Sequence, residues 1–188
     1  MSLANKLTIF RIVLIPPVLV FVSLDGALMA WLAAALFTLA AVTDILDGMV
    51  ARKQNTISTF GKVMDPIADK LLVVSALIPL VAQGALPAWM VVVVIGREFI
   101  LNGLRILSTA SRGEVIAASW WGKTKTVLQD VMIVVLMLRH QITGFWGGQV
   151  FIQILVWAAL VLTVLSTTDY LWKNRRVWLS MELHGGKG

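Results

Sequence analysis

The sequence from residue 26 to residue 43 reads GALMAWLAAALFTLAAVT and contains no charged side chain. A helix that crosses the hydrocarbon core of a membrane needs about 20 predominantly apolar residues. The apolar pattern continues beyond residue 43, and we predict a helix over 28–50. Hydrocarbon offers no partner for backbone polar groups, so an apolar segment of this length is expected to cross as a helix.

Five further segments have a similar length and apolar character. Residues 83–87 read QGALP and predict a tight turn, and the glycines within 144–148 predict another. The third helix is expected to begin near Asp65 or one turn earlier. Pro16-Pro17 is expected to kink the first helix or to split off an interfacial piece. The predicted helices are 5–24, 28–50, 65–83, 88–110, 120–139 and 149–172. We therefore predict an all-α integral membrane protein, one domain over 1–188 with six transmembrane helices.

The composition supports this class and excludes others. Hydrophobic residues make up 59% of the 188 residues and charged residues 14%, against about 45–50% and about 25% in globular proteins. The mean hydropathy is +0.86, which argues against a soluble domain and against disorder. The chain has no cysteine and two histidines, so disulfides, thiolate metal sites and histidine-rich zinc sites are excluded. Any metal must therefore bind oxygen ligands.

The basic residues predict the orientation of the bundle. The net charge of +6 indicates topology and contact with anionic membrane lipids, and no nucleic-acid partner is expected. Arg139 and His140 fall on the other side and are expected at the surface. The cytoplasmic set is Lys6, Arg11, Arg52, Lys53, Lys62, Arg112, Lys123, Lys125, Lys173, Arg175, Arg176 and Lys187. We predict cytoplasmic termini and, because no N-terminal targeting segment is evident, a bacterial cytoplasmic membrane.

Four acidic residues lie between residues 44 and 69, which read DILDGMVARKQNTISTFGKVMDPIAD. Asp44 and Asp47 are three residues apart, and Asp65 and Asp69 are four apart, so each pair lies on one helical face. The short connection makes the two helices antiparallel neighbours, and the four carboxylates can converge. Clustered carboxylates in a low-dielectric region repel one another. One or two divalent metal ions, which prefer such oxygen ligands, would compensate this charge.

Each acid also has a simpler structural explanation. Asp65 precedes a proline and fits a helix N-cap. Asp69 can pair with Lys70, and Asp47 can pair with Arg52. These explanations account for single acids better than for four acids at facing helical spacings.

The same segment resembles the signature of the CDP-alcohol phosphatidyltransferase family in every residue type and spacing. The pattern is Asp44-x2-Asp47-Gly48-x2-Ala51-Arg52-x8-Gly61-x3-Asp65-x3-Asp69. Eight fixed positions over 26 residues make this a specific signal. Weaker similarities to the branch of the family that uses glycerol 3-phosphate extend over most of the chain. They are Asn5-x2-Thr8-x2-Arg11, Arg97-Glu98 with Arg105, and Trp121-Gly122-Lys123-x-Lys125-Thr126.

The resemblance implies a reaction and a set of residue roles. The phosphatidyl group of CDP-diacylglycerol would pass to glycerol 3-phosphate, giving phosphatidylglycerol phosphate and CMP. The metal would bind to four aspartates, Asp44, Asp47, Asp65 and Asp69. Two ions of Mg2+ or Mn2+ are expected. Asp69 would also be the base for the attacking hydroxyl. The family further implies a six-helix core, a cytoplasmic active site and a homodimer. The residues that would line the CDP-diacylglycerol pocket are Gly48, Ala51, Arg52 and Gly61.

A second group of basic residues flanks the connection between the fourth and fifth predicted helices. We hypothesise that Arg105, Arg112, Lys123 and Lys125 bind the phosphate of the acceptor. Lys123 and Lys125 alone also fit a role in topology. Arg97-Glu98 is expected to form an ion pair, and Asp130 is placed outside the site.

Two alternatives stay open on the sequence alone. Within the family, the acceptor could be inositol phosphate, phosphatidylglycerol, serine or a choline-type alcohol. Outside it, a small cation transporter would also use intramembrane acids. Such a transporter would explain the carboxylates but not the spacing of Gly48, Ala51 and Arg52.

Overall fold

The computed structural model of the chain describes residues 3–54, 59–112, 120–173 and 175. Residues 3–4, 45–54, 59–63, 105–112 and 120–123 are described by their backbone only. Within these ranges all regular structure is helical. The helices are α1 (Leu3–Ser23), α2 (Ala27–Gln54), α3 (Thr59–Ala82), α4 (Ala88–Arg112), α5 (Trp120–Met137), α6 (Arg139–Ile142) and α7 (Gly148–Lys173). The six long helices correspond to the six that the sequence predicts.

Three details differ from the predictions. Helix α3 begins at Thr59, so Asp65 lies inside the helix and the explanation of Asp65 as an N-cap is wrong. Helix α1 continues through Pro16-Pro17 as one helix, so no separate N-terminal piece is split off. The short helix α6 was not predicted. It follows α5, which ends at Met137, two residues before the predicted end.

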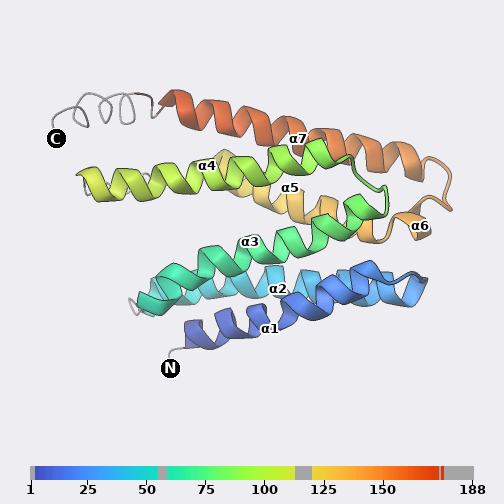
Figure 1. Cartoon of the computed structure of the whole chain (residues 1–188), viewed down its shortest axis with the longest axis horizontal. Coiled ribbons are helices and arrows are strands. Elements are labelled where there is room, and N and C mark those ends of the chain that lie inside the picture. Colours follow the sequence, from blue (N-terminus) through green and yellow to red (C-terminus); the bar gives the residue numbers. More distant parts are fainter. Residues whose placement is uncertain (1–2, 55–58, 113–119, 174, 176–188) are drawn as a thin grey trace.

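The helices alternate in direction between the two ends of the bundle. Figure 1 shows the N-terminal ends of α1 and α3 and the C-terminal ends of α2, α4 and α7 at one end. The connections from α1 to α2 and from α3 to α4 lie at the other end, together with α6. Both connections turn at glycines with positive φ, 121° at Gly26 and 69° at Gly84, which a residue with a side chain rarely adopts.

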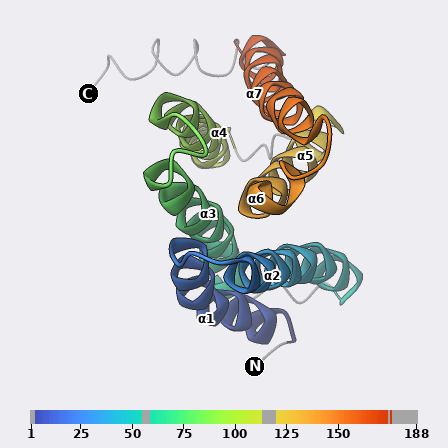
Figure 2. The same ribbon diagram turned by 90° about the vertical axis from the view of Figure 1, so that its right-hand side faces the viewer.

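The long helices form two groups (Figure 2). Helix α1 packs on α2 and α3, while α7 packs on α4 and α5. Contacts of α3 with α4 and α5, and of α2 with α5, join the groups. One apolar core runs through both groups and includes Phe37, Leu77 and Ile133. Helix packing thus positions the residues that the sequence predicts for the site.

The outside of the bundle is also strongly apolar. Exposed side chains include Trp31, Val92, Phe99, Ile154 and Leu165, and so large an apolar surface is typical of contact with lipid. Three described helical segments are long and apolar enough to cross a membrane: Asn5–Ser23, Ala27–Asp44 and Gly148–Lys173. This agrees with a membrane protein, while the six-span topology remains a prediction.

Leu77 and Leu71 on α3 test this division into core and lipid-facing surface. Leu77 is fully buried, and Leu71 is 49% exposed. We expect Leu77→Ala to lower the stability by about 2–5 kcal/mol because it leaves a cavity. Leu71→Ala should change it by less than about 1 kcal/mol in detergent. Thermal unfolding of the purified variants measures both, and equal losses would contradict the assigned core.

Candidate functional site

Two buried polar side chains of α1 contact the acidic residues of α2 and α3. Arg11 Nη1 lies 2.7 Å from Asp44 Oδ1, and the Arg11 side chain is 1% exposed. Thr8, one turn earlier on α1, donates a hydrogen bond to Asp65 Oδ1. A guanidinium buried in an apolar bundle needs a carboxylate partner. These contacts therefore hold α1 against both acidic helices.

Sequence reasoning missed this role of α1. It assigned Arg11 to the cytoplasmic set, whereas the side chain is buried against Asp44. The available signal was the spacing of Thr8 and Arg11, which places both on one face of a helix. Their partners lie on other helices, so the spacing alone could not identify them.

The three acids with described side chains interact electrostatically. Asp44 experiences the charges of Asp65 and Lys70 in addition to that of Arg11. Asp69 experiences the charges of Asp44 and Lys70. Mutual repulsion of this kind favours binding of a cation between carboxylates.

The chemistry of these donors fits a divalent cation, because carboxylate oxygens are the ligands that Mg2+ and Mn2+ prefer. Among the described side chains, no group of three or more acids or histidines is close enough to hold a metal ion. The side chain of Asp47 lies outside the described part. The metal site of the four aspartates therefore remains a prediction.

Asp130 on α5 lies closer to these acids than we expected. Its carboxylate experiences the charges of Asp69 and Asp44, as well as those of Lys125 and Glu98. The sequence analysis placed Asp130 outside the site, since its neighbour four residues on, Val134, is apolar. The packing of α5 against α2 and α3 brings it into range.

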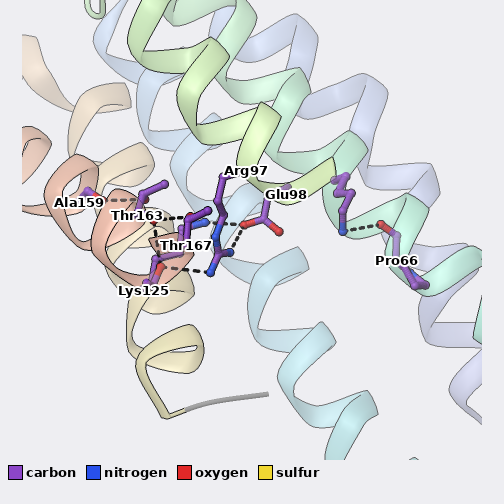
Figure 3. Close-up of polar contacts among 9 residues, drawn as sticks. Pro66, Arg97, Glu98, Lys125, Ala159, Thr163 and Thr167 are labelled. Atoms are coloured by element: carbon purple, nitrogen blue, oxygen red, sulfur yellow. Dashed lines mark hydrogen bonds and ion pairs between the residues drawn. The ribbon is translucent and has the colours of Figure 1, made fainter. Parts of the chain in front are cut away.

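A second polar network joins α4, α5 and α7 (Figure 3). Glu98 Oε1 lies 2.6 Å from Arg97 Nη1 and also accepts a hydrogen bond from Lys125 Nζ. Arg97 Nη2 donates to Ser166 Oγ over 3.3 Å. The expected ion pairing of Arg97 and Glu98 is confirmed. Ser166 and Lys125, from two other helices, complete the network.

The Lys125 side chain is 1% exposed. A buried ammonium is kept only with a carboxylate partner, here Glu98. Of the four residues expected to bind the acceptor phosphate, this is the one whose side chain is described. The Lys125 ammonium is therefore desolvated and fixed by Glu98, unlike the mobile ammonium of a lysine on the surface.

A small cavity of about 30 Å3 lies between Asp69 and Glu98 of the second polar network. Its walls include Asp69 from α3, Glu98 from α4, and Thr126 and Gln129 from α5. A space of this size holds about one water molecule. The acid expected to act as the base and the carboxylate that holds Lys125 thus line one cavity.

The other predicted site residues lie in described helices, but their side chains are outside the described part. Figure 1 places the C-terminal ends of α2 and α4 and the N-terminal end of α3 at the same end of the bundle. The backbone therefore brings most of the predicted positions to one end. These residues are Asp47, Gly48, Ala51 and Arg52 in α2, Gly61 in α3, Arg105 and Arg112 in α4, and Lys123 in α5.

Named relatives resemble the chain over most of its length. A Bacillus subtilis protein named CDP-diacylglycerol–glycerol-3-phosphate 3-phosphatidyltransferase is 42% identical over 185 residues, covering 92% of this chain and 95% of that protein. A Rickettsia felis protein of the same name is 35% identical, covering 90% and 93%. A Mycobacterium tuberculosis protein named probable phosphatidylglycerophosphate synthase is 39% identical, covering 90% and 80%.

The sequence model of one family also matches residues 1–165, a range that contains the first polar network and all of the second except Ser166. This family match and the similarity to the named relatives show that the chain belongs to the CDP-alcohol phosphatidyltransferase family.

Proposed function

We propose that the chain transfers the phosphatidyl group from CDP-diacylglycerol to glycerol 3-phosphate, giving phosphatidylglycerol phosphate and CMP. The observation that carries this proposal is the 42% identity to a relative named for this reaction, in an alignment that covers 95% of the relative's length. The acceptor hydroxyl oxygen forms a bond to the phosphatidyl phosphorus. The bond between that phosphorus and the CMP oxygen breaks, and CMP leaves with the electron pair.

Asp44, Asp47, Asp65 and Asp69 are proposed to hold one or two divalent ions, Mg2+ or Mn2+. When bound, such ions supply positive charge to the pyrophosphate oxygens and so make CMP a better leaving group. The contacts of Arg11 with Asp44 and of Thr8 with Asp65 support this role, because they restrict the orientation of two of the donors.

Asp69 is proposed to accept the proton of the acceptor hydroxyl as the new bond forms. It lines the cavity between α3, α4 and α5, where one water-sized group fits. Gly48, Ala51, Arg52 and Gly61 are proposed to line the pocket for the cytidine diphosphate group. The small residues would let the nucleotide approach the backbone, and Arg52 would bind phosphate oxygens.

The acceptor phosphate is proposed to bind Arg105, Arg112, Lys123 and Lys125. Lys125 forms an ion pair with Glu98, and Glu98 forms a second ion pair with Arg97. A desolvated ammonium of fixed position binds a phosphate more strongly than a mobile one, because less entropy is lost. The phosphate would approach Lys125 while Glu98 keeps the side chain in place.

The proposal includes the cellular arrangement. The chain would be one membrane domain with six spans and cytoplasmic termini, acting as a homodimer in a bacterial cytoplasmic membrane. The even number of long helices supports this, as does the position of the two described chain ends at one end of the bundle (Figure 1). The active site would then face the cytoplasm, where glycerol 3-phosphate is available.

CMP release tests the reaction and the acceptor together. With purified protein, CDP-diacylglycerol and Mg2+, we expect release with glycerol 3-phosphate and not with inositol phosphate, serine or phosphatidylglycerol. Asp69→Asn should lower kcat at least about 100-fold, because proton acceptance is lost. Asp169→Asn, an exposed acid on α7, is the matched control. Release with another acceptor would overturn the acceptor assignment and keep the reaction class.

Metal removal is expected to abolish this activity. Chelation with EDTA should stop CMP release, and Mg2+ or Mn2+ should restore it, because the clustered carboxylates need a cation. A titration of activity against free metal concentration gives the apparent affinity. Full activity after exhaustive chelation would contradict the metal role of the four aspartates.

Lys125→Gln and Lys123→Gln test the acceptor pocket. We expect each to raise the KM for glycerol 3-phosphate about tenfold or more, in line with the loss of a charge-assisted hydrogen bond. The KM for CDP-diacylglycerol should stay within about twofold. Steady-state kinetics with each substrate varied separately measures both constants, and Lys173→Gln, an exposed lysine on α7, is the control. Equal effects on both KM values would contradict the assignment.

A further inference from the structure

A cavity of about 470 Å3 lies at the end of the bundle opposite the acidic residues. Its walls come from the connection between α1 and α2, the C-terminal parts of α3 and α5, and α6. Figure 2 views the bundle from this end. None of the residues proposed for the phosphatidyl transfer lines this cavity.

A fixed cation lies on one wall. Arg139 donates hydrogen bonds from Nη1 to the carbonyl of Leu136 over 3.2 Å and from Nη2 to Gln83 Oε1 over 3.1 Å. Gln83 is itself fixed by a 2.6 Å hydrogen bond from its Nε2 to the carbonyl of Val22. Arg139 is partly exposed, in keeping with the expected surface position, and these bonds fix its guanidinium. A guanidinium has five N–H donors, so these two bonds leave donors for an anionic ligand.

Two acceptors line the same cavity. Asp25 attracts Arg139 electrostatically, but the two make no direct ion pair in the described part of the chain. The Oε1 atom of Gln141 is buried and has no hydrogen-bond partner among the described residues. A buried acceptor without a partner is unfavourable by about 1–3 kcal/mol, so a ligand with N–H or O–H groups would stabilise this wall.

Apart from His140, the rest of the lining is apolar and includes Phe21, Ala30, Leu80 and Met137. A ligand that fits must therefore combine an anion for Arg139, a hydrogen-bond donor for Asp25 and Gln141, and an apolar part. A phosphodiester with a terminal ammonium or hydroxyl, attached to acyl chains, has all three. Such lipids surround the bundle in a membrane and need no route through water.

We propose that this cavity binds the headgroup of a phospholipid from the leaflet opposite the active site. The phosphodiester binds Arg139, and the ammonium or hydroxyl group of the headgroup donates to Asp25 and Gln141. Phosphatidylethanolamine and phosphatidylglycerol share this chemistry. Phosphatidylcholine has the phosphodiester but no donor on its headgroup, so it should bind more weakly.

Binding of short-chain lipids to the full-length protein in detergent tests the proposal. Dihexanoyl phosphatidylethanolamine, phosphatidylglycerol and phosphatidylcholine are titrated separately, and inorganic phosphate forms a fourth arm. We expect the first two to bind at least fivefold more tightly than phosphatidylcholine. Asp25→Asn and Gln141→Leu should each remove this preference, and Asp169→Asn should preserve it. The difference between wild type and Asp25→Asn isolates this cavity, because the acidic site is intact in both proteins.

Two results would overturn the proposal. One is an equal affinity for all three lipids, or a preference that survives Asp25→Asn. The other is binding of inorganic phosphate as tight as that of the lipids, which would assign the cavity to a free anion. Arg139→Gln also removes the contacts with Gln83 and Leu136 and can disturb the fold, so the Asp25 and Gln141 variants decide. Their CMP release should stay within about twofold of wild type, which separates this test from that of the transferase reaction.

Discussion

The contact on which the described site depends is the ion pair between Arg11 on α1 and Asp44 on α2. An apolar bundle solvates carboxylates poorly, so acids gathered in it repel one another and need compensating charge. Arg11 supplies one such charge from inside the protein, at 2.7 Å from Asp44. The Arg11 side chain is 1% exposed and that of Asp44 is 43% exposed, so the guanidinium is desolvated while the carboxylate keeps part of its hydration. The first helix is therefore part of the site, although the signature lies entirely in the second and third helices.

In the second group of helices, α4, α5 and α7, the charge of a carboxylate is also compensated by cations from the protein. Glu98 balances two cations, Arg97 on its own helix and Lys125 on α5. Ser166 on α7 accepts a further hydrogen bond from Arg97. Each group thus holds a network that fixes three helices, and the small cavity lies between Asp69 and Glu98.

The helices were predictable because apolar length is a local property of the sequence. The start of α3 was not, because the polar turn before Asp65 has no apolar pattern and the proline suggested a boundary. The helical faces of the two acid pairs were predictable, since the spacings fix them, while the convergence of the four carboxylates remains a prediction. Partners on distant helices were not. Lys125 lies 27 residues from Glu98, and Asp65 lies 57 residues from Thr8. Only tertiary packing determines which side chains meet.

The two ends of the bundle differ in how they use charge, and this difference follows from solvation. At one end, the buried cations Arg11 and Lys125 are each paired with a partly buried carboxylate, Asp44 and Glu98. At the other end, Arg139 is held by amide and carbonyl groups, while the nearest acid, Asp25, stays out of direct contact. A cation fixed by neutral groups keeps most of its charge available to a ligand. Arg11, by contrast, is paired with the Asp44 carboxylate and restricts the orientation of that carboxylate. The same residue type is thus structural in Arg11 and suited to binding in Arg139, and its hydrogen-bond partners determine which role it has.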